Sequence, residues 1–346
     1  MNPVPVSVAA APGTATQAGP TLSVSGLCIS ANRDSRSIEL LRGVSFHVAS
    51  GETLALVGES GCGKSITSLA VMGLLAPGLS MSGEVALTDA GGRIDLVALS
   101  AAERRKLCGR RLGMIFQEPM TSLNPMQRVG DQIAETLTTH GICSRQEAAR
   151  RAVAMLDRMG IADPGRRALA LPHELSGGMR QRVMIAMAMI GEPDLLIADE
   201  PTTALDVTVQ AQILELIRDL SRERGMATLF ISHDLAVVAD IADRVAVMYA
   251  GEIVETGPID QVLDAPLHPY TIGLIASRPA LSTERRARLS AIFGAVPEPG
   301  RRPQGCAFHP RCSLAKPGLC DVGDVPLKRF DGRDVRCLRV GERVQA

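Results

Sequence analysis

The sequence predicts an α/β fold around a parallel sheet that is buried on both faces. Two observations indicate this class: several short segments are uninterrupted apolar runs, and segments with helical periodicity separate them. Strands that helices cover on both faces show such runs, whereas half-exposed strands alternate apolar and polar residues. The predicted core strands are Leu54–Val57, Met114–Phe116, Leu195–Ala198, Thr228–Ile231 and Val245–Tyr249.

Two further kinds of element complete the predicted fold. Loose alternation over Leu22–Val48, and a turn at Asp89–Gly92 between two short β-like segments, predict antiparallel strands and a hairpin. Apolar residues recur at helical spacing over Val129–Leu171 and again over Val207–Arg222, where Gly225 ends the pattern. We therefore expect an antiparallel β part beside the core sheet and a helical insertion between its second and third strands.

The composition disfavours two classes of protein. The 346 residues include 37 basic and 37 acidic side chains, so the formal net charge is zero. Nucleic acid is therefore not an expected partner, because proteins that bind its phosphates usually carry a basic surplus. No apolar run approaches the roughly 18 residues of a membrane-spanning helix. Residues 1–20 lack the pattern of a signal peptide and are expected to form a disordered tail.

A glycine-rich stretch directly after the first core strand carries the strongest functional signal. Its backbone N–H groups and the start of the following helix are expected to surround a polyphosphate. Lys64 would reach the β- and γ-phosphates, and Ser65 would contact Mg²⁺. A glycine-rich surface turn is the alternative, which the preceding strand disfavours. The residues that match the pattern G-x-x-x-x-G-K-[ST] are Gly58, Glu59, Ser60, Gly61, Cys62, Gly63, Lys64 and Ser65.

Polar side chains follow three other core strands. Asp199 and Glu200 end one strand, and Gln117 and His233 directly follow two others. Because ligands of an open α/β sheet bind beyond the carboxyl ends of its strands, we expect these residues to meet at the nucleotide. Asp199 is predicted to hold Mg²⁺, and Glu200 to polarise an attacking water. Any one of them alone would more often be an ordinary structural residue.

A second anion-binding pattern follows Leu175. Ser176, Gly177 and Gly178 open a helical segment that continues to Ile190. Exposed N–H groups and the helix dipole attract anions at such a position. Because the phosphate loop already forms one cradle, we expect this pattern to serve a nucleotide held by another subunit. An ordinary helix N-cap at Ser176 explains the local pattern equally well.

The order of these motifs resembles the nucleotide-binding subunit of ATP-binding cassette (ABC) transporters. That family's fold is a phosphate-loop ATPase domain with a parallel core sheet, an antiparallel β subdomain and a helical signature subdomain. Here the domain would span residues 21–258, with the helical subdomain at about 120–190 and a small cysteine-containing extension at 259–346. The residues that carry the resemblance are the phosphate loop, Gln117, Leu175–Gly178, Asp199–Glu200, Ala204–Asp206 and His233.

Three further stretches are similar to the oligopeptide/dipeptide importer branch, which includes nickel importers. They are Phe116–Pro125, His268–Tyr270 and Gly305–Cys312. This resemblance implies an ATPase that energises import of peptides, or of a related small solute, from a peripheral position at the cytoplasmic face of the inner membrane. The implied partners are a second ABC ATPase subunit, two integral membrane permease subunits and, indirectly, a solute-binding protein. The alternative is a soluble ABC ATPase that acts on nucleic acid or ribosomes.

The resemblance also implies roles for individual residues. ATP and Mg²⁺ would lie between Gly58–Ser65 of one subunit and Ser176–Gly178 of the other, with Asp206 across the seam. Gln117 would link the γ-phosphate and Mg²⁺ to the helical insertion, and His233 would contact the γ-phosphate.

One position departs from the family's pattern. The family usually places an aromatic residue upstream of the phosphate loop to stack on adenine, and the alignment puts Ala31 there. Either another residue stacks on the base or the base is held loosely, so the sequence does not predict a strict preference for ATP over GTP.

Four of the eight cysteines lie in the C-terminal extension, at Cys306, Cys312, Cys320 and Cys337. In a cytosolic protein, such a group indicates a metal site more than disulfides. The tight C-x-x-C pairs of structural zinc are missing. By resemblance, this region carries a 4Fe–4S cluster in some dipeptide importer subunits, and four thiolates would suit one. Buried free thiols are the alternative.

Cys62 lies inside the phosphate loop, beside Lys64 and a predicted helix start. Both neighbours favour a thiolate. We expect a thiol-alkylating reagent to inactivate the enzyme and MgATP to protect it, unless the cysteine is only a small filler.

Overall fold

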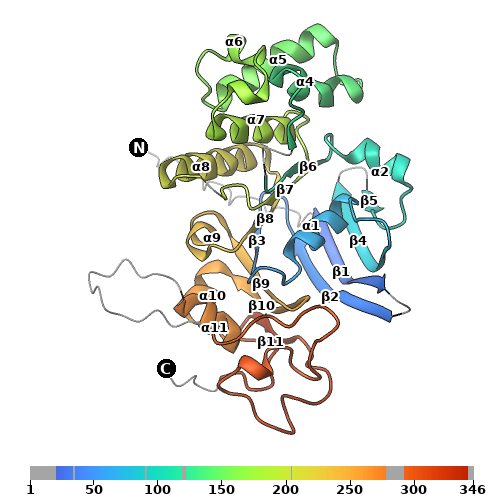
Figure 1. Ribbon diagram of the computed structural model, residues 1–346, viewed down its shortest axis with the longest axis vertical. Helices are drawn as coiled ribbons and strands as arrows, with labels where there is room; N and C mark the ends of the chain where they lie inside the picture. Colours follow the sequence, from blue (N-terminus) through green and yellow to red (C-terminus); the bar gives the residue numbers. More distant parts are fainter. Residues whose placement is uncertain are drawn as a thin grey trace, which may run out of the picture.

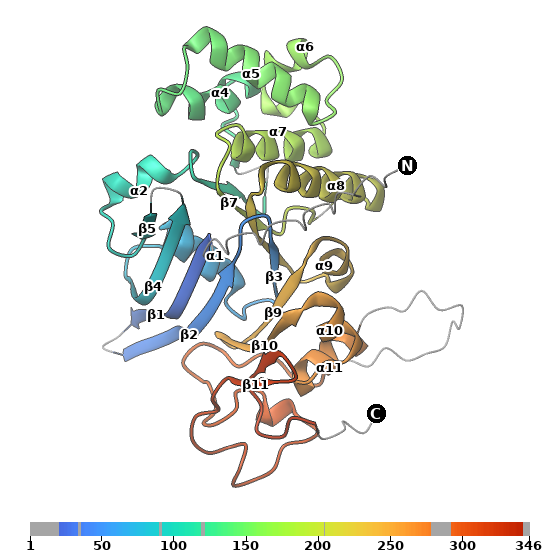
Figure 2. The same cartoon turned by 180° about the vertical axis from the view of Figure 1, so that it is seen from behind.

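The computed structural model describes residues 21–33, 36–89, 92–118, 122–203, 205–277 and 292–341. The predicted tail at residues 1–20 lies outside these ranges, as do Pro119–Thr121 and Ala204 from two of the motifs. Figure 1 shows a helical lobe at the top, two sheets in the middle and the C-terminal residues at the bottom. The opposite view in Figure 2 shows the same order.

An eight-stranded sheet forms the centre, in the order β11-β12-β10-β9-β3-β8-β7-β6. Five of its strands pair in parallel and match the predicted core strands, with ends that differ by a residue or two. Every residue of β3, β6, β7 and β8 is buried, as the apolar runs predicted. The five are β3 (Thr53–Val57), β6 (Leu112–Ile115), β7 (Leu195–Asp199), β8 (Ala227–Ser232) and β9 (Arg244–Tyr249).

Three antiparallel strands extend this sheet on the β9 side: β10 (Glu252–Pro258), β11 (Lys328–Phe330) and β12 (Arg333–Val335). Glu255 of β10 pairs with Val335 of β12, so the end of the chain returns to the central sheet. No residue pattern predicted the two short strands β11 and β12. They place the extension directly against the domain that contains the phosphate loop.

A second, antiparallel sheet has the order β2-β1-β4-β5. The register Asp89↔Gly92 joins β4 and β5, which confirms the predicted hairpin. Its apolar side packs on α1 and on the face of the central sheet that carries Leu54 and Leu56. The strands are β1 (Leu22–Arg33), β2 (Arg36–Val48), β4 (Leu79–Asp89) and β5 (Gly92–Asp95).

The helical insertion is confirmed, with α4, α5 and α6 packed together and against α7 (Figure 1). The Asp206 carboxylate caps α8, and Gly225 ends it in the left-handed region, as its sequence pattern predicted. Of the helices in the described ranges, none is long and apolar enough to cross a membrane. The α-helices are α1 (Lys64–Met72), α2 (Ala101–Leu107), α4 (Val129–Thr139), α5 (Arg145–Arg158), α6 (Pro164–Ala168), α7 (Gly177–Met189), α8 (Val207–Arg224), α9 (Leu235–Ile241), α10 (Ile259–Asp264) and α11 (Pro269–Ala276); short 3₁₀ helices lie at Pro172–Glu174 and His309–Arg311.

Candidate functional site

The phosphate-loop residues join the end of β3 to the start of α1. Gly61 and Gly63 have φ angles of 80° and 112°, a region that residues with a Cβ rarely adopt. A Cβ at Gly58 would stand 2.2 Å from the carbonyl oxygen of Met248 in β9. These three glycines are therefore required by the backbone of the loop and by its close approach to the sheet.

The Lys64 side chain folds back into this loop. Its Nζ donates to the carbonyl oxygens of Gly58 at 2.8 Å and Glu59 at 3.2 Å, and the residue is 5% exposed. The N-cap residue of α1 is Gly63, which has no side chain to cap the first turn. Its N–H groups, the helix dipole and the Lys64 ammonium therefore act together on an anion at this position.

Asp199 ends β7 beside the first turn of α1. Its carboxylate accepts hydrogen bonds from the Ser65 hydroxyl at 3.3 Å and the Ser68 hydroxyl at 3.2 Å. Burial raises the pKa of Asp199, while the two hydroxyls and the charge of Lys64 oppose the rise. Hydroxyl and carboxylate oxygens are the ligands that Mg²⁺ prefers, so Ser65 and Asp199 fit the ion as a pair.

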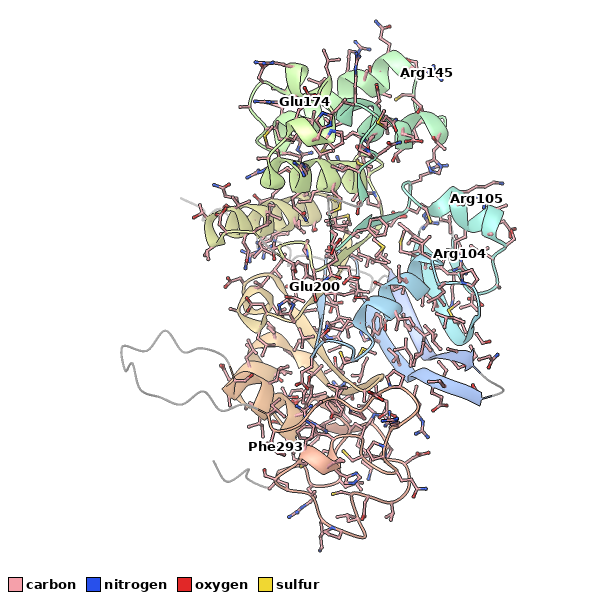
Figure 3. The ribbon with its side chains drawn as sticks, viewed as in Figure 1. Arg104, Arg105, Arg145, Glu174, Glu200 and Phe293 are labelled. Atoms are coloured by element: carbon pink, nitrogen blue, oxygen red, sulfur yellow. The ribbon has the colours of Figure 1, made fainter. Side chains whose placement is uncertain are left out.

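Glu200 is the residue at which the other strand-end side chains meet. Its Oε2 accepts from Gln117 Nε2 at 3.3 Å and from Thr203 Oγ1 at 2.9 Å, and its Oε1 lies 3.2 Å from His233 Nδ1. The Glu200 side chain is 14% exposed and lies near the centre of the molecule (Figure 3). The structure thus brings together three of the four residues that the strand-end argument expected to meet, whereas the fourth, Asp199, contacts Ser65 and Ser68. Thr203 was missed, because a threonine in a turn carries no signal of its own.

The backbone of Glu200 is itself unusual. Its φ of 49° lies in the left-handed region, which costs a non-glycine residue about 1–2 kcal/mol. Its N–H donates to the carbonyl oxygen of Ile231 at 2.9 Å, which ties the turn to β8. This conformation turns the Glu200 side chain out of line with β7 and toward the ends of β6 and β8.

Ser176, Gly177 and Gly178 begin α7, in the helical lobe rather than at the phosphate loop. The Ser176 hydroxyl accepts from the N–H of Met179 at 3.3 Å, an ordinary N-cap. The start of α8 lies next to this turn, since a Cβ at Gly178 would stand 3.4 Å from a Val209 methyl group. Within one chain, Ser176–Gly178 and the neighbouring Asp206 therefore lie at the starts of α7 and α8, whereas Lys64 begins α1. Figures 1 and 2 show α7 and α8 apart from α1.

The prediction that Cys62 is a thiolate is wrong. The residue is 0% exposed, and burial raises the pKa of its thiol more than the nearby Lys64 charge lowers it. Cys62 fills the space beneath the loop, where its sulfur would stand 2.8 Å from a Cβ at Gly58. The sequence showed the positive neighbours of this thiol but not its burial.

Two residues of the C-terminal extension contact the phosphate loop, and the sequence did not indicate either contact. The Tyr270 hydroxyl accepts from the N–H of Glu59 at 2.8 Å. Arg311 pairs with the Glu59 carboxylate, with an N–O distance of 2.7 Å. The sequence patterns at His268–Tyr270 and Gly305–Cys312 indicated a family branch and nothing more. The fold shows that each contains a residue in contact with the phosphate loop.

The four cysteines of the extension line one pocket. Burial is the main cause of the raised pKa of Cys306, about 11, and the other three cysteines add to it. Across the described ranges, no group of three or more His, Cys, Asp or Glu is arranged to hold a metal ion. The donor set matches that of an iron–sulfur cluster in kind and number.

Ala31 lies in β1, opposite Ile38 of β2 and Leu79 of β4. Its methyl group offers no ring for stacking on a base. The position at which the family usually has an aromatic residue therefore lies within the antiparallel sheet and is occupied by alanine.

Two protein-family models match parts of this chain. Residues 41–203 match a family model described as ABC transporter, and residues 254–320 match one described as oligopeptide/dipeptide transporter, C-terminal region. A putative peptide import ATP-binding protein of Brucella melitensis is 51% identical over 329 residues, which cover 92% of this chain and 97% of that protein. The chain belongs to the ABC transporter family. Its resemblance to the peptide-import branch is confirmed by the same matches.

A second relative of this ABC protein is the oligopeptide transport ATP-binding protein OppD of Bacillus subtilis, 52% identical over 296 residues, or 85% of this chain and 82% of OppD. Among solved structures, the dimeric structure of MJ0796, a bacterial ABC transporter cassette, has a TM-score of 0.61 and 27% identity, covering 69% of this chain and 98% of that one. cbiO1 from Clostridium perfringens, part of the ABC transporter complex cbiONQ, has a TM-score of 0.59 and 27% identity, covering 71% and 91% of the two chains. The predicted ABC nucleotide-binding fold is confirmed.

Proposed function

We propose that this ABC protein is an ATPase subunit that energises import of oligopeptides or dipeptides through separate membrane subunits. The cassette and the peptide-transporter C-terminal region occur in one chain, and relatives with peptide-import names match over most of its length. These matches favour peptide import over the alternative of an ATPase that acts on nucleic acid or ribosomes. The observation that carries the enzymatic half is the convergence of Gln117, Thr203 and His233 on Glu200.

In this proposal, the loop residues bind the nucleotide and Glu200 handles the water. Lys64 and the N–H groups from Gly58 to Ser65 hold the phosphates, and Ser65 and Asp199 hold Mg²⁺. The ion, when bound, neutralises charge that develops on the transferred phosphoryl group. Glu200 orients the attacking water and accepts its proton.

The residues around Glu200 fix its carboxylate. Thr203 and Gln117 donate to one carboxylate oxygen, which leaves the other to His233 or to a water. Gln117 and His233 lie on the more exposed side of the cluster, with the His233 side chain 60% exposed. From there they can contact a γ-phosphate. When the γ-phosphate leaves, a shift of Gln117 or His233 would change the position of the Glu200 carboxylate.

We further propose that Ser176–Gly178 and Asp206 complete the site of a second ATPase subunit, identical or related. Among the described residues, no neighbour requires glycine at Gly177 or Gly178: a Cβ at Gly177 would meet none of them within 4 Å, and one at Gly178 would make ordinary contact with Val209. Glycine is a poor helix former, by about 1 kcal/mol relative to alanine in a helix interior, so helix stability does not account for these two glycines. Close approach of an outside group, such as a phosphate on the facing subunit, would account for them.

The proposed membrane partners are two permease subunits, with a solute-binding protein acting indirectly, at the cytoplasmic face of the inner membrane. The segment that follows β6 supports contact with an apolar partner. Phe116 is 38% exposed and Met126 is 86% exposed, and Gln117 of the Glu200 cluster lies in the same segment. A partner docked there could sense the γ-phosphate through Gln117.

We also propose that Cys306, Cys312, Cys320 and Cys337 hold a 4Fe–4S cluster. Support comes from the four thiols around one pocket and from the chemistry of the set. The buried His268 ring lines the same pocket, and its Nε2 forms no hydrogen bond of good geometry with any described residue. Iron and acid-labile sulfide analysis after anaerobic purification tests the proposal, and a colourless, metal-free protein would refute it.

Replacing Glu200 by Gln tests the enzymatic proposal. The variant should bind MgATP with the affinity of the unmodified protein and lose turnover by at least about 100-fold, because general base catalysis contributes about that much or more. Glu223→Gln, in an exposed ion pair with Arg158, is the matched control and should leave turnover unchanged. Near-normal hydrolysis by Glu200→Gln would remove Glu200 as the base. Co-purification of permease subunits with the tagged protein tests the transport half.

A further inference from the structure

Arg311 of the C-terminal extension holds the phosphate loop from outside. Its Nη1 donates to Glu59 Oε2 at 2.7 Å and its Nη2 donates to Glu59 Oε1 at 3.0 Å. The arginine side chain is 5% exposed and the glutamate side chain 31% exposed. Two parallel bonds between a guanidinium and a carboxylate fix orientation as well as distance, which a lysine cannot reproduce.

The arginine is itself fixed by its surroundings. Its Nε donates to the carbonyl oxygen of Phe293 at 2.8 Å, and Nη2 also reaches that of Ile292 at 3.3 Å. Phe293 marks this part of the extension in Figure 3. The guanidinium carbon lies 5.7 Å from the ring centroid of Tyr249 in β9. The Glu59 hydrogen bonds raise the pKa of Arg311, so its charge is permanent.

The main chain of Glu59 continues these contacts into the loop. Its N–H donates to the hydroxyl of Tyr270, a residue that is 0% exposed. Its carbonyl oxygen accepts from Lys64 Nζ at 3.2 Å and from the N–H of Cys62 at 3.3 Å. An unbroken series of contacts thus runs from Arg311 through Glu59 to Lys64, the residue that would meet the phosphates.

We propose that Arg311 is a positioning residue of the nucleotide site, which orders the phosphate loop for ATP through Glu59. The inference rests on the proposed role of that loop. A loop that is ordered before binding loses less conformational freedom when the nucleotide binds, so affinity rises without any new contact to the ligand. Glu59 is partly exposed, so it can be hydrated when Arg311 is removed. The loop then becomes mobile while the buried core stays intact.

A double-mutant cycle on the full chain tests this role, with Mg²⁺ and the non-hydrolysable analogue AMP-PNP as the probe in calorimetric titrations. Arg311→Gln and Glu59→Gln should each weaken binding about tenfold, which is about 1.4 kcal/mol. The double variant should bind no more weakly than the weaker single variant, because both remove one interaction. Arg311→Lys keeps the charge without the planar fork and should give an intermediate affinity.

Arg302→Gln is the matched control. Arg302 also joins the extension to the sheet, through Glu252 and through the carbonyl oxygen of Ala250 at 3.1 Å. The Arg302→Gln variant should have a lower melting temperature than the unmodified protein and an unchanged affinity for AMP-PNP. Equal losses of affinity in Arg302→Gln and Arg311→Gln, or additive losses in the cycle, would overturn the proposal. Unchanged binding by Lys64→Ala would instead refute the phosphate-loop function on which it rests.

Discussion

Replacing Tyr270 by Phe should destabilise the protein at the junction between the phosphate loop and the extension. The Tyr270 hydroxyl accepts the N–H of Glu59 at 2.8 Å, and its ring packs against Tyr249 and Phe308 with centroids 4.7 and 5.4 Å away. The substitution keeps the ring and leaves a main-chain N–H without its acceptor. An unsatisfied buried donor costs about 1–3 kcal/mol. We expect a loss of about 1–2 kcal/mol in the free energy of unfolding, because Glu59 is partly exposed and water can reach it.

Urea unfolding followed by circular dichroism measures this loss, with the slope m checked for constancy. Tyr249→Phe is the control, since its ring belongs to the same cluster. Among the described residues, the Tyr249 hydroxyl accepts a single long hydrogen bond, of 3.4 Å from Arg311, whose nitrogens have other acceptors. The control should therefore lose less than about 0.5 kcal/mol. Equal losses in the two variants would show that ring packing decides, and would refute the reasoning from the Glu59 N–H.

Three further predictions concern the nucleotide site. Burial raises the pKa of Asp199, and Mg²⁺ needs the ionised carboxylate. As the pH is lowered, the Mg²⁺-dependent part of AMP-PNP affinity should therefore be lost at a higher pH than with an aspartate of ordinary pKa. Titrations with and without Mg²⁺ between pH 5 and 8 measure this part of the affinity, and a pH-independent difference would contradict the prediction. Gly178→Ala should leave the free energy of unfolding unchanged or raise it by up to about 1 kcal/mol, yet abolish most ATPase activity. Full activity would argue against a second subunit at this turn. Cys62 should react with N-ethylmaleimide more slowly than the partly exposed Cys143, as measured by peptide mapping with mass spectrometry. Faster labelling of Cys62 would support the prediction of a thiolate.

The local patterns in the sequence were enough for the core of the fold and for much of the site. Unbroken apolar runs predicted the five parallel strands of the central sheet, and the glycine spacing around Lys64 predicted the phosphate loop. Both signals are short-range, because strand burial and loop conformation are written in adjacent residues. Position at a strand end was enough to expect that Gln117, Glu200 and His233 would meet, since parallel strands share one carboxyl edge.

The contacts of the extension could not be predicted in this way. Arg311 and Glu59 are separated by most of the chain, and an arginine in a proline-rich segment reads as an ordinary surface residue. The same holds for Tyr270, whose partner is a main-chain N–H that no pattern identifies. The short strands β11 and β12 return the chain to the central sheet, which adds a further attachment of the extension to the domain that contains the loop.

The sequence by itself therefore determined the fold class, the phosphate-binding loop and the edge of the sheet at which polar side chains gather. The tertiary structure decided the burial of Cys62, the part of Thr203 in the Glu200 cluster and the attachment of Arg311 to the loop. The physical reason is that strand and loop conformations follow from neighbouring residues. Burial, pKa and ion pairing depend instead on which distant segments pack together.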